Sequence, residues 1–288
     1  MREGLAVVSA QRDARAIDPE ALQRKQDQVI ETLRGCRRAL IAWSGGVDST
    51  LLAALCRDVL GKANALAVTA DSPSLAREDL EEAGRLAVRL DLDHLIVPTR
   101  EVEDPVYRAN TEARCYVCKH ELFRELEALA QERRIPVILY GAIGDDQLAE
   151  RPGQRAAAQR GVRAPLQEAG LSKTEVRALA KSLGLPNWDR PQNACLSSRI
   201  PFGEPVTPER LSRIERAERL VKAEGFRQVR VRSMGTGSQA RIEVGADEVA
   251  RLADAALRMR LMDEVRGCGF HVVEFDPRGY HPVEALPA

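Results

Sequence analysis

The chain has 288 residues, of which 44% are hydrophobic and 30% charged, and its 43 basic residues balance its 43 acidic residues. This length is enough for two modest domains, each with a buried core. A net charge of zero provides no overall field that attracts polyanions, so we expect no nucleic-acid partner. The N-terminus lacks an apolar segment with a cleavage site, and no apolar run approaches the length of a membrane span. We therefore expect a cytoplasmic protein without a membrane partner.

The first half of the chain alternates between helical and extended patterns. A charged helical stretch covers residues 18–34 and precedes the first apolar run. Short apolar runs predict strands at 39–43, 65–70, 95–98 and 137–140, and amphipathic patterns predict helices at 49–60, 75–90 and 119–133. Such alternation is typical of an α/β protein with a doubly wound parallel sheet, which has helices on both faces.

The first predicted strand is followed by a glycine-rich loop, Ser44-Gly45-Gly46-Val47-Asp48-Ser49. Glycines let the backbone approach an anion, and the first N–H groups of the following helix lack partners within the helix. The two serines add hydroxyl donors, and Asp48 is suited to cap the helix or to orient hydrated Mg²⁺. An ordinary glycine-rich turn is the alternative, but it needs neither the serines nor the aspartate.

Ligands on parallel sheets bind beyond the carboxyl ends of the strands. The loops at 69–74 and 141–146 should share that edge with the glycine-rich loop. We therefore expect the adenine and ribose of a nucleotide to contact residues after the second and fourth strands, including Thr69, Ser72 and Gly141.

The second half of the chain is less regular up to residue 193, apart from a helix predicted at 173–183. A linker at 201–208 precedes a predicted unit with helices at 208–224 and 247–265 and strands at 228–233, 241–244 and 270–275. This pattern predicts a nucleotide-binding domain over residues 1–200 and a smaller α+β domain over 201–288, used for substrate binding or oligomerisation.

Three of the six cysteines form a candidate site. Cys115 and Cys118 have CxxC spacing, which fits half a zinc site, a redox pair or two ligands of an iron–sulfur cluster, and Cys195 lies far downstream. No second CxxC motif is present to complete a zinc site with four thiolates. Three thiolates do fit a cubane cluster in which one iron is left without a protein ligand. The remaining cysteines sit in helical or apolar patterns and are predicted to be buried: Cys36, Cys56 and Cys268.

Two levels of resemblance follow from these motifs. The loop at 44–49 resembles the SGGxDS loop of the ATP pyrophosphatase (PP-loop) families, whose fold is adenine nucleotide alpha hydrolase-like and which bind the β and γ phosphates of ATP as a pyrophosphate leaving group. Over about residues 29–280 the chain resembles the LarE family, the ATP-dependent sulfur transferases of nickel-pincer nucleotide biosynthesis. The further motifs that carry this resemblance are RPG at 151–153, KTEVR at 173–177, GLPNWD at 184–189, CLSSRIPFG at 195–203, VRVR at 229–232 and ARIEV at 240–244.

The resemblance implies a substrate, cofactors and an assembly. The substrate would be pyridinium-3,5-biscarboxylic acid mononucleotide, a carboxylate of which is adenylated with ATP and Mg²⁺ and then converted to a thiocarboxylate. Homo-oligomerisation is a further expectation. The resemblance also implies that Ser198 and Arg199 contact a substrate phosphate and that Glu218 faces the same cavity, although a surface glutamate is an equal alternative.

Arg230 and Arg232 alternate along a predicted strand, so both side chains project from one face. They are candidates to bracket the phosphate or the carboxylates of the substrate. A solvated strand face is the alternative, because other basic residues lie nearby in the sequence.

Two sources of sulfur exist in the resembling family. In one, a lone cysteine at the position of Cys195 gives up its own sulfur. In the other, three cysteines at the positions of Cys115, Cys118 and Cys195 hold a [4Fe-4S] cluster that carries a sulfide from a sulfur donor. The presence of all three favours the cluster. The alternatives are a PP-loop tRNA thiolase or amidotransferase-type synthetase, and a nucleotide-binding module without turnover.

Overall fold

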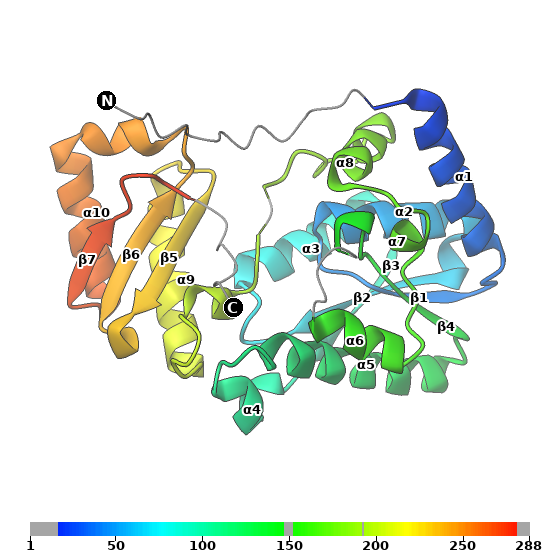
Figure 1. Cartoon of the computed structure of the whole chain (residues 1–288), viewed down its shortest axis with the longest axis horizontal. Helices are drawn as coiled ribbons and strands as arrows, with labels where there is room; N and C mark the ends of the chain where they lie inside the picture. The colour runs from blue at the N-terminus through cyan, green and yellow to red at the C-terminus, as the bar shows by residue number, and fades with distance from the viewer. Residues whose placement is uncertain (1–16, 147–151, 192, 281–288) are drawn as a thin grey trace, which may run out of the picture.

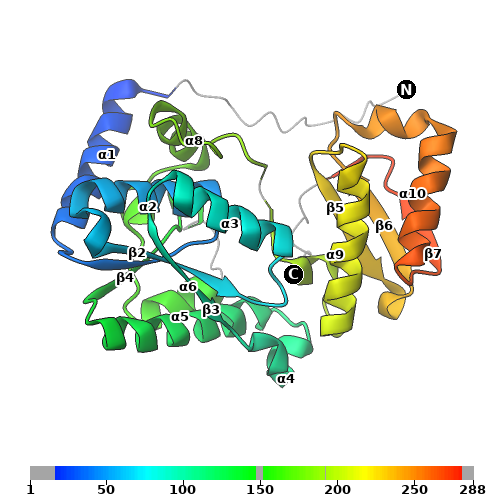
Figure 2. The same ribbon diagram turned by 180° about the vertical axis from the view of Figure 1, so that it is seen from behind.

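The computed structural model describes residues 17–146, 152–191 and 193–280, which build two sheets with their own helices (Figure 1). Figure 2 shows the same arrangement from behind, with the larger α/β part and the smaller part joined through the segment before α9. In the part of the chain that the structure describes, no helix is long and apolar enough to cross a membrane.

The larger sheet has four parallel strands in the order β3-β2-β1-β4. They are β1 (Ala39–Ala42), β2 (Ala65–Asp71), β3 (Asp93–Pro98) and β4 (Val137–Tyr140). The apolar runs of the sequence predicted each of these strands. Because all four run in the same direction, the loops after β1, β2 and β4 meet at one edge of the sheet.

Helices cover both faces of this sheet, as expected for a doubly wound fold (Figures 1 and 2). Ile41 packs in a core with α1, α2, α3 and α8, whereas its neighbour Leu40 packs with α5 and α6 on the opposite face. The helices of this part are α1 (Pro19–Arg34), α2 (Val47–Leu60), α3 (Arg77–Arg89), α4 (Pro105–Arg108), α5 (Arg114–Arg133), α6 (Pro152–Gln159), α7 (Pro165–Glu168) and α8 (Lys173–Ser182).

Helix α5 differs from its prediction in a way that matters for the cysteines. It begins at Arg114 rather than at residue 119. Its N-cap, Ala113, makes no side-chain cap hydrogen bond, so the sequence carries no start signal at this point. As a result Cys115 and Cys118 belong to a helix and, three residues apart, lie on one face of it.

The smaller part contains a mixed sheet of β5 (Val229–Met234), β6 (Gln239–Val244) and β7 (Val272–Phe275), with α9 (Pro208–Ala223) and α10 (Ala255–Gly267). Strand β6 pairs antiparallel with β5 and parallel with β7. The sequence predicted this α+β unit, but the expectation of one helix over 247–265 was wrong. A 3-10 turn at Val249–Ala253 comes first, and Asp254 then caps α10 by accepting from the N–H groups of Ala256 and Leu257.

The core of the smaller part extends beyond the linker. Leu196 and Ile200 pack in it, and so do Val102 and Tyr107 from the larger part. Residues before 200 therefore contribute to both cores, and the domain boundary at residue 200 stays a prediction.

A buried ion pair connects the segment before the linker to α9. Nε of Arg199 donates to Oε1 of Glu218 at 2.8 Å, and the two side chains are 0% and 5% exposed. The same carboxylate oxygen accepts the backbone N–H of Val231 on β5 at 3.0 Å. Glu218 is therefore a buried residue, and the alternative that it is a surface glutamate was wrong.

We expect the substitution Glu218→Ala to lower the free energy of unfolding by about 3–5 kcal/mol, because it leaves the Arg199 charge buried without its partner. Urea denaturation followed by circular dichroism measures this change. The adjacent exposed residue provides the control, since Arg219→Ala should stay within about 0.5 kcal/mol of the parent protein. A loss below about 1 kcal/mol for Glu218→Ala would show that the pair is not a stabilising element.

Candidate active site

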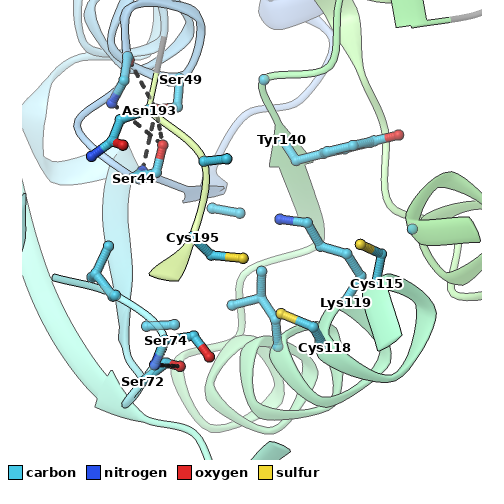
Figure 3. Close-up of a pocket in the computed structure, with 18 of the residues that line it drawn as sticks. Ser44, Ser49, Ser72, Ser74, Cys115, Cys118, Lys119, Tyr140, Asn193 and Cys195 are labelled. Carbon is cyan, nitrogen blue, oxygen red and sulfur yellow. Dashed lines mark hydrogen bonds between the residues drawn. The ribbon is translucent and has the colours of Figure 1, made fainter. Parts of the chain in front are cut away.

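A cavity of about 630 Å³ opens at the carboxyl edge of the larger sheet (Figure 3). The glycine-rich loop lines one end, and the three candidate cysteines line another part of the wall. The cavity brings together most of the residues predicted from the sequence: Ser44, Gly46, Asp48, Ser49, Thr69, Ser72, Cys115, Cys118, Gly141 and Cys195. Gly45, Ser198, Arg199, Glu218, Arg230 and Arg232 do not line it.

The glycine-rich loop is held in shape by its own hydroxyls. The side chains of Ser44 and Ser49 lie within hydrogen-bond distance, with Oγ atoms 3.1 Å apart, and Ser49 Oγ also accepts the Ser44 N–H at 3.2 Å. Gly46 is the N-cap of α2 and has no side chain to satisfy the first N–H groups of that helix. These groups and the helix dipole therefore favour a phosphate at this end of the cavity.

The backbone of Gly45 has φ +70°, a conformation that favours glycine. Its carbonyl accepts the side-chain amide of Asn187 at 2.9 Å and is therefore engaged within the protein. Gly45 thus shapes the loop without lining the cavity.

Gly141, after β4, permits close contact with the start of α2. A Cβ atom at this position would lie 2.8 Å from the Ser49 nitrogen and 2.9 Å from its Cα. Both are backbone atoms, which cannot move independently of the helix. The absence of a side chain at Gly141 therefore sets where the phosphate loop sits against the sheet.

Asp48 is paired with Lys173, the first residue of α8. The Lys173 Nζ atom lies 2.7 Å from both carboxylate oxygens of Asp48. Burial raises the pKa of Asp48, with Lys173 acting in the opposite direction and Asp146 in the same one. Asp48 and Asp146 both line the cavity, and their carboxylates are oxygen donors of the kind that Mg²⁺ prefers.

Lys173 was missed as a site residue in the sequence, although a signal existed. A lysine in the first turn of a helix is unfavourable next to the positive end of the helix dipole. Ser172 and Glu175 form a capping box that fixes this helix start. A cation placed there, next to the phosphate loop, is suited to a ligand phosphate.

Two of the residues expected to contact adenine or ribose form hydrogen bonds within the protein. The Thr69 hydroxyl donates to the Trp43 carbonyl at 2.8 Å and lies 2.9 Å from Nε2 of His94. The Ser72 hydroxyl hydrogen-bonds to the buried carboxylate of Glu101. Nucleotide binding by Thr69 and Ser72 stays a prediction.

The three candidate cysteines differ in exposure. Cys115 and Cys195 are exposed, whereas Cys118 is partly buried, and burial raises its pKa to about 12. The neighbouring Lys119 lowers this pKa, whereas the charges of Cys195 and Cys115 raise it further. The other cysteines are buried as predicted: Cys36, Cys56 and Cys268.

The three thiols are the right type of ligand for an iron–sulfur cluster, but in this structure they are not arranged as a ligand set. Thiols that line one cavity match the ligands that such clusters take. Within residues 17–146, 152–191 and 193–280, however, no three His, Cys, Asp or Glu side chains are grouped so that they could hold a metal ion. Ligation of a cluster by all three cysteines therefore stays a prediction.

Arg199 holds the loop that carries Cys195. Besides Glu218, its guanidinium donates to the carbonyls of Ala194 at 2.6 Å and Cys195 at 3.0 Å, and to the Asn193 side chain at 2.8 Å. Its Nη1 atom also lies 3.0 Å from the Ser198 hydroxyl. These internal contacts use its donors, so a phosphate contact by Arg199 or Ser198 stays a prediction.

Arg230 and Arg232 lie on β5, in the smaller part. Arg232 pairs with Glu243 at 2.9 Å and donates to the Ser198 carbonyl at 3.1 Å. Arg230 is buried with its guanidinium 4.2 Å from the centre of the Tyr280 ring. Burial and the nearby Arg199 lower the pKa of Arg230. The alternative of a solvated strand face was therefore wrong.

We expect Gly141→Ala to weaken ATP binding at least tenfold and to destabilise the fold by about 1–3 kcal/mol, because the added methyl group meets the backbone of Ser49. Isothermal titration with ATP and urea denaturation measure the two effects. Gly84→Ala is the matched control, since a Cβ there meets nothing within 4 Å. Unchanged ATP affinity in Gly141→Ala would contradict the proposed role of the close contact.

Comparison with known proteins adds the family. A family model described as NAD synthase matches residues 22–140. A protein of Synechocystis sp. named only as uncharacterized is 44% identical over 259 residues, which cover 90% of this chain and 96% of that protein. The pyridinium-3,5-bisthiocarboxylic acid mononucleotide synthase of Lactiplantibacillus plantarum is 33% identical over 260 residues, 90% of this chain and 92% of the synthase. One subunit of the glutamine-hydrolyzing GMP synthase of Methanopyrus kandleri is 29% identical over 228 residues, 69% of this chain and 68% of that subunit.

These similarities agree with the two parts of the structure. The NAD synthase match covers the phosphate loop and ends with β4, so it concerns the ATP-binding sheet. The similarity to the Lactiplantibacillus plantarum synthase extends over 90% of the chain and so includes residues of both sheets. The chain therefore belongs to the LarE family of ATP-dependent sulfur transferases, within the PP-loop enzymes.

Proposed function

We propose that the protein adenylates a carboxylate of pyridinium-3,5-biscarboxylic acid mononucleotide with ATP and then converts it to a thiocarboxylate. The observation that carries the proposal is the cavity that joins the phosphate loop to Cys195. The synthase named above is similar along nearly the whole chain, which supports the choice of substrate.

Adenylation solves a problem of leaving groups. A free carboxylate resists nucleophiles because it is anionic and would have to expel oxide. Attack of a carboxylate oxygen on the α-phosphorus of ATP expels pyrophosphate, which the N–H groups at the start of α2 and the hydroxyls of Ser44 and Ser49 are placed to hold. Asp48 and Asp146 would hold Mg²⁺, which neutralises phosphate charge when bound. Lys173 would then exchange Asp48 for a phosphate oxygen.

Sulfur transfer completes the reaction. A sulfur nucleophile adds to the carbonyl carbon of the acyl-adenylate, and the bond from that carbon to the AMP oxygen breaks, so that AMP leaves with the electron pair. The nucleophile must act as an anion, and it must reach a carbonyl held near the phosphate loop. Cys195 lines the cavity and is exposed, which meets the second requirement.

We favour a [4Fe-4S] cluster on Cys115, Cys118 and Cys195 as the carrier of the sulfide. Such a cluster, when bound, supplies a deprotonated sulfide that is strongly nucleophilic. The chain's contribution is three thiols that line the same cavity, two from α5 and one from the segment before residue 196. Sacrifice of the Cys195 sulfur is the alternative, supported by the exposure of that thiol.

The substrate's phosphate has a candidate site in the smaller part. Arg232 and Arg199 are paired with carboxylates, whereas the Arg230 guanidinium has no hydrogen bond or ion pair to a residue that the structure describes. A buried guanidinium without an anion is unfavourable unless a ligand supplies one. We assign the substrate phosphate to Arg230.

We also propose that the reaction takes place in the cytosol. The free cysteines support this proposal, because thiols stay reduced in that compartment. Homo-oligomerisation and the identity of the sulfur donor stay predictions.

The proposal is tested by pyrophosphate release from ATP on addition of the mononucleotide, together with iron and acid-labile sulfide content of protein reconstituted without oxygen. We expect release that depends on the mononucleotide, and a cluster that Cys115→Ser loses. Cys268→Ser is the matched control, because this cysteine is buried outside the cavity.

Each rival has its own result in that experiment. If iron-free protein still thiolates the substrate, and its mass falls at Cys195 by the mass of the lost sulfur, sacrificial transfer is established. Pyrophosphate release that depends on RNA would favour a tRNA thiolase. Release that depends on ammonia or glutamine would favour an amidotransferase-type synthetase. ATP binding without pyrophosphate release would favour a nucleotide-binding module that lacks turnover.

We expect Arg230→Met to raise the KM for the mononucleotide roughly 10- to 100-fold, because a charge-assisted contact to its phosphate is lost. The KM for ATP should stay within about twofold, since Arg230 does not line the cavity that holds the phosphate loop. Steady-state pyrophosphate release measures both constants. Arg241→Met, on the neighbouring strand and partly exposed, is the control and should change neither. An unchanged KM for the mononucleotide would remove Arg230 from the phosphate site.

A further inference from the structure

Four basic side chains line the cavity, within the residues that the structure describes: Arg114, Lys119, Lys173 and Arg190. Three of them are engaged. Arg114 donates to Asn110 Oδ1 at 2.5 Å and to the Ser197 carbonyl at 2.9 Å, and Arg190 pairs with Asp79 at 2.6 Å. Lys173 pairs with Asp48.

Lys119 is the exception. This side chain is partly buried, yet in the described ranges it has neither a hydrogen bond nor an ion pair. In Figure 3 its amino group points into the cavity, on the side of Tyr140 and Cys195. A cation held in this way is available to an anionic ligand.

The direction of Lys119 depends on a glycine of another helix. A Cβ atom at Gly153, near the start of α6, would lie 2.9 Å from Cγ of Lys119. Cγ is close to the backbone of α5, so this part of the lysine cannot avoid the contact by rotating its far end. Gly153 is the second residue of α6, and the absence of a side chain there leaves the space that the Lys119 stem occupies.

The chemistry of adenylation needs such a cation. The carboxylate of the substrate is an anion, and it must approach the α-phosphate of ATP, which belongs to a polyanion. The two repel each other over the few ångströms at which the new oxygen–phosphorus bond forms. Glu101 and Asp146 also line the cavity, beside Asp48 and Asp79, which are paired with Lys173 and Arg190.

We propose that Lys119 binds the reacting carboxylate of the substrate beside the α-phosphate, and that Gly153 is a positioning residue that keeps the lysine in the cavity. This inference rests on the proposed function, because it assigns a partner to the carboxylate of that substrate. The carboxylate oxygen then bonds to the α-phosphorus, and the bond from that phosphorus to the bridging oxygen breaks as pyrophosphate leaves with the electron pair.

Lys119→Met tests the inference, because methionine keeps much of the apolar stem and removes the charge. We expect the KM for the mononucleotide in pyrophosphate release to rise roughly 10- to 100-fold, with the KM for ATP within about twofold. Lys119→Arg should recover part of the loss, because it restores the charge. Gly153→Ala should raise the same KM, and the double variant should be no worse than Lys119→Met alone.

Lys62→Met is the matched control. This exposed lysine pairs with Asp91 outside the cavity, so its kinetics should equal those of the parent protein. ATP titration and thermal melting of every variant establish that it is folded. If Lys119→Met does not fold, Gly153→Ala and Lys119→Arg decide the question through the KM for the mononucleotide.

The outcomes separate the two levels of the proposal. An unchanged KM for the mononucleotide in Lys119→Met overturns the inference and leaves the proposed function intact. An equal rise in the KM for ATP also overturns it, since Lys119 would then be a phosphate ligand. Parent protein that releases pyrophosphate independently of the mononucleotide overturns the proposed function and the inference with it.

Discussion

The contact on which the site depends most is the buried pair of Arg199 and Glu218. The guanidinium is fully buried, so its charge needs the carboxylate, and its remaining donors hold the carbonyls of Ala194 and Cys195. The loop with Cys195 is therefore held, through Arg199, by a residue of α9 in the core of the smaller part. On its other side, the Leu196 N–H donates to the Ser74 carbonyl of the larger part at 2.8 Å. One short segment is thus fixed by both sheets, and the position of the Cys195 backbone opposite the phosphate loop follows.

The distribution of paired and unpaired cations adds a second level of organisation. At the cavity Lys173 and Arg190 pair with carboxylates, and Arg114 donates to an amide oxygen and a backbone carbonyl. The Lys119 amino group and the Arg230 guanidinium have neither kind of partner among the described residues. They lie on different elements, α5 and β5, in the larger and the smaller part. An acceptor with a phosphate at one end and carboxylates at the other matches two separated charges better than a single basic pocket does. In this view the electrostatics select the orientation of the acceptor, and the phosphate loop selects ATP.

The parts of the structure that the sequence predicted are those whose cause is local. The strands at 39–43 and 137–140 could be predicted because buried parallel strands are short apolar runs. The phosphate loop could be predicted because two glycines and two serines within a short stretch form it. Other features depend on partners that are distant in the chain. Lys173 meets Asp48, and Gly153 meets Lys119, only after the fold brings α8 and α6 to the cavity. The start of α5 was missed because no side chain caps it.

Tyr280, the last residue that the structure describes, connects the end of the described chain to Arg230. Its N–H donates to the Val244 carbonyl at 2.6 Å, and its ring lies against the Arg230 guanidinium. Removal of Tyr280 would spare every described helix and strand of both sheets, yet it would remove the aromatic ring beside Arg230. If Arg230 binds a phosphate as proposed, such a protein would keep its fold and bind that phosphate less tightly. Anything joined to the chain directly after Tyr280 would begin next to the Arg230 guanidinium.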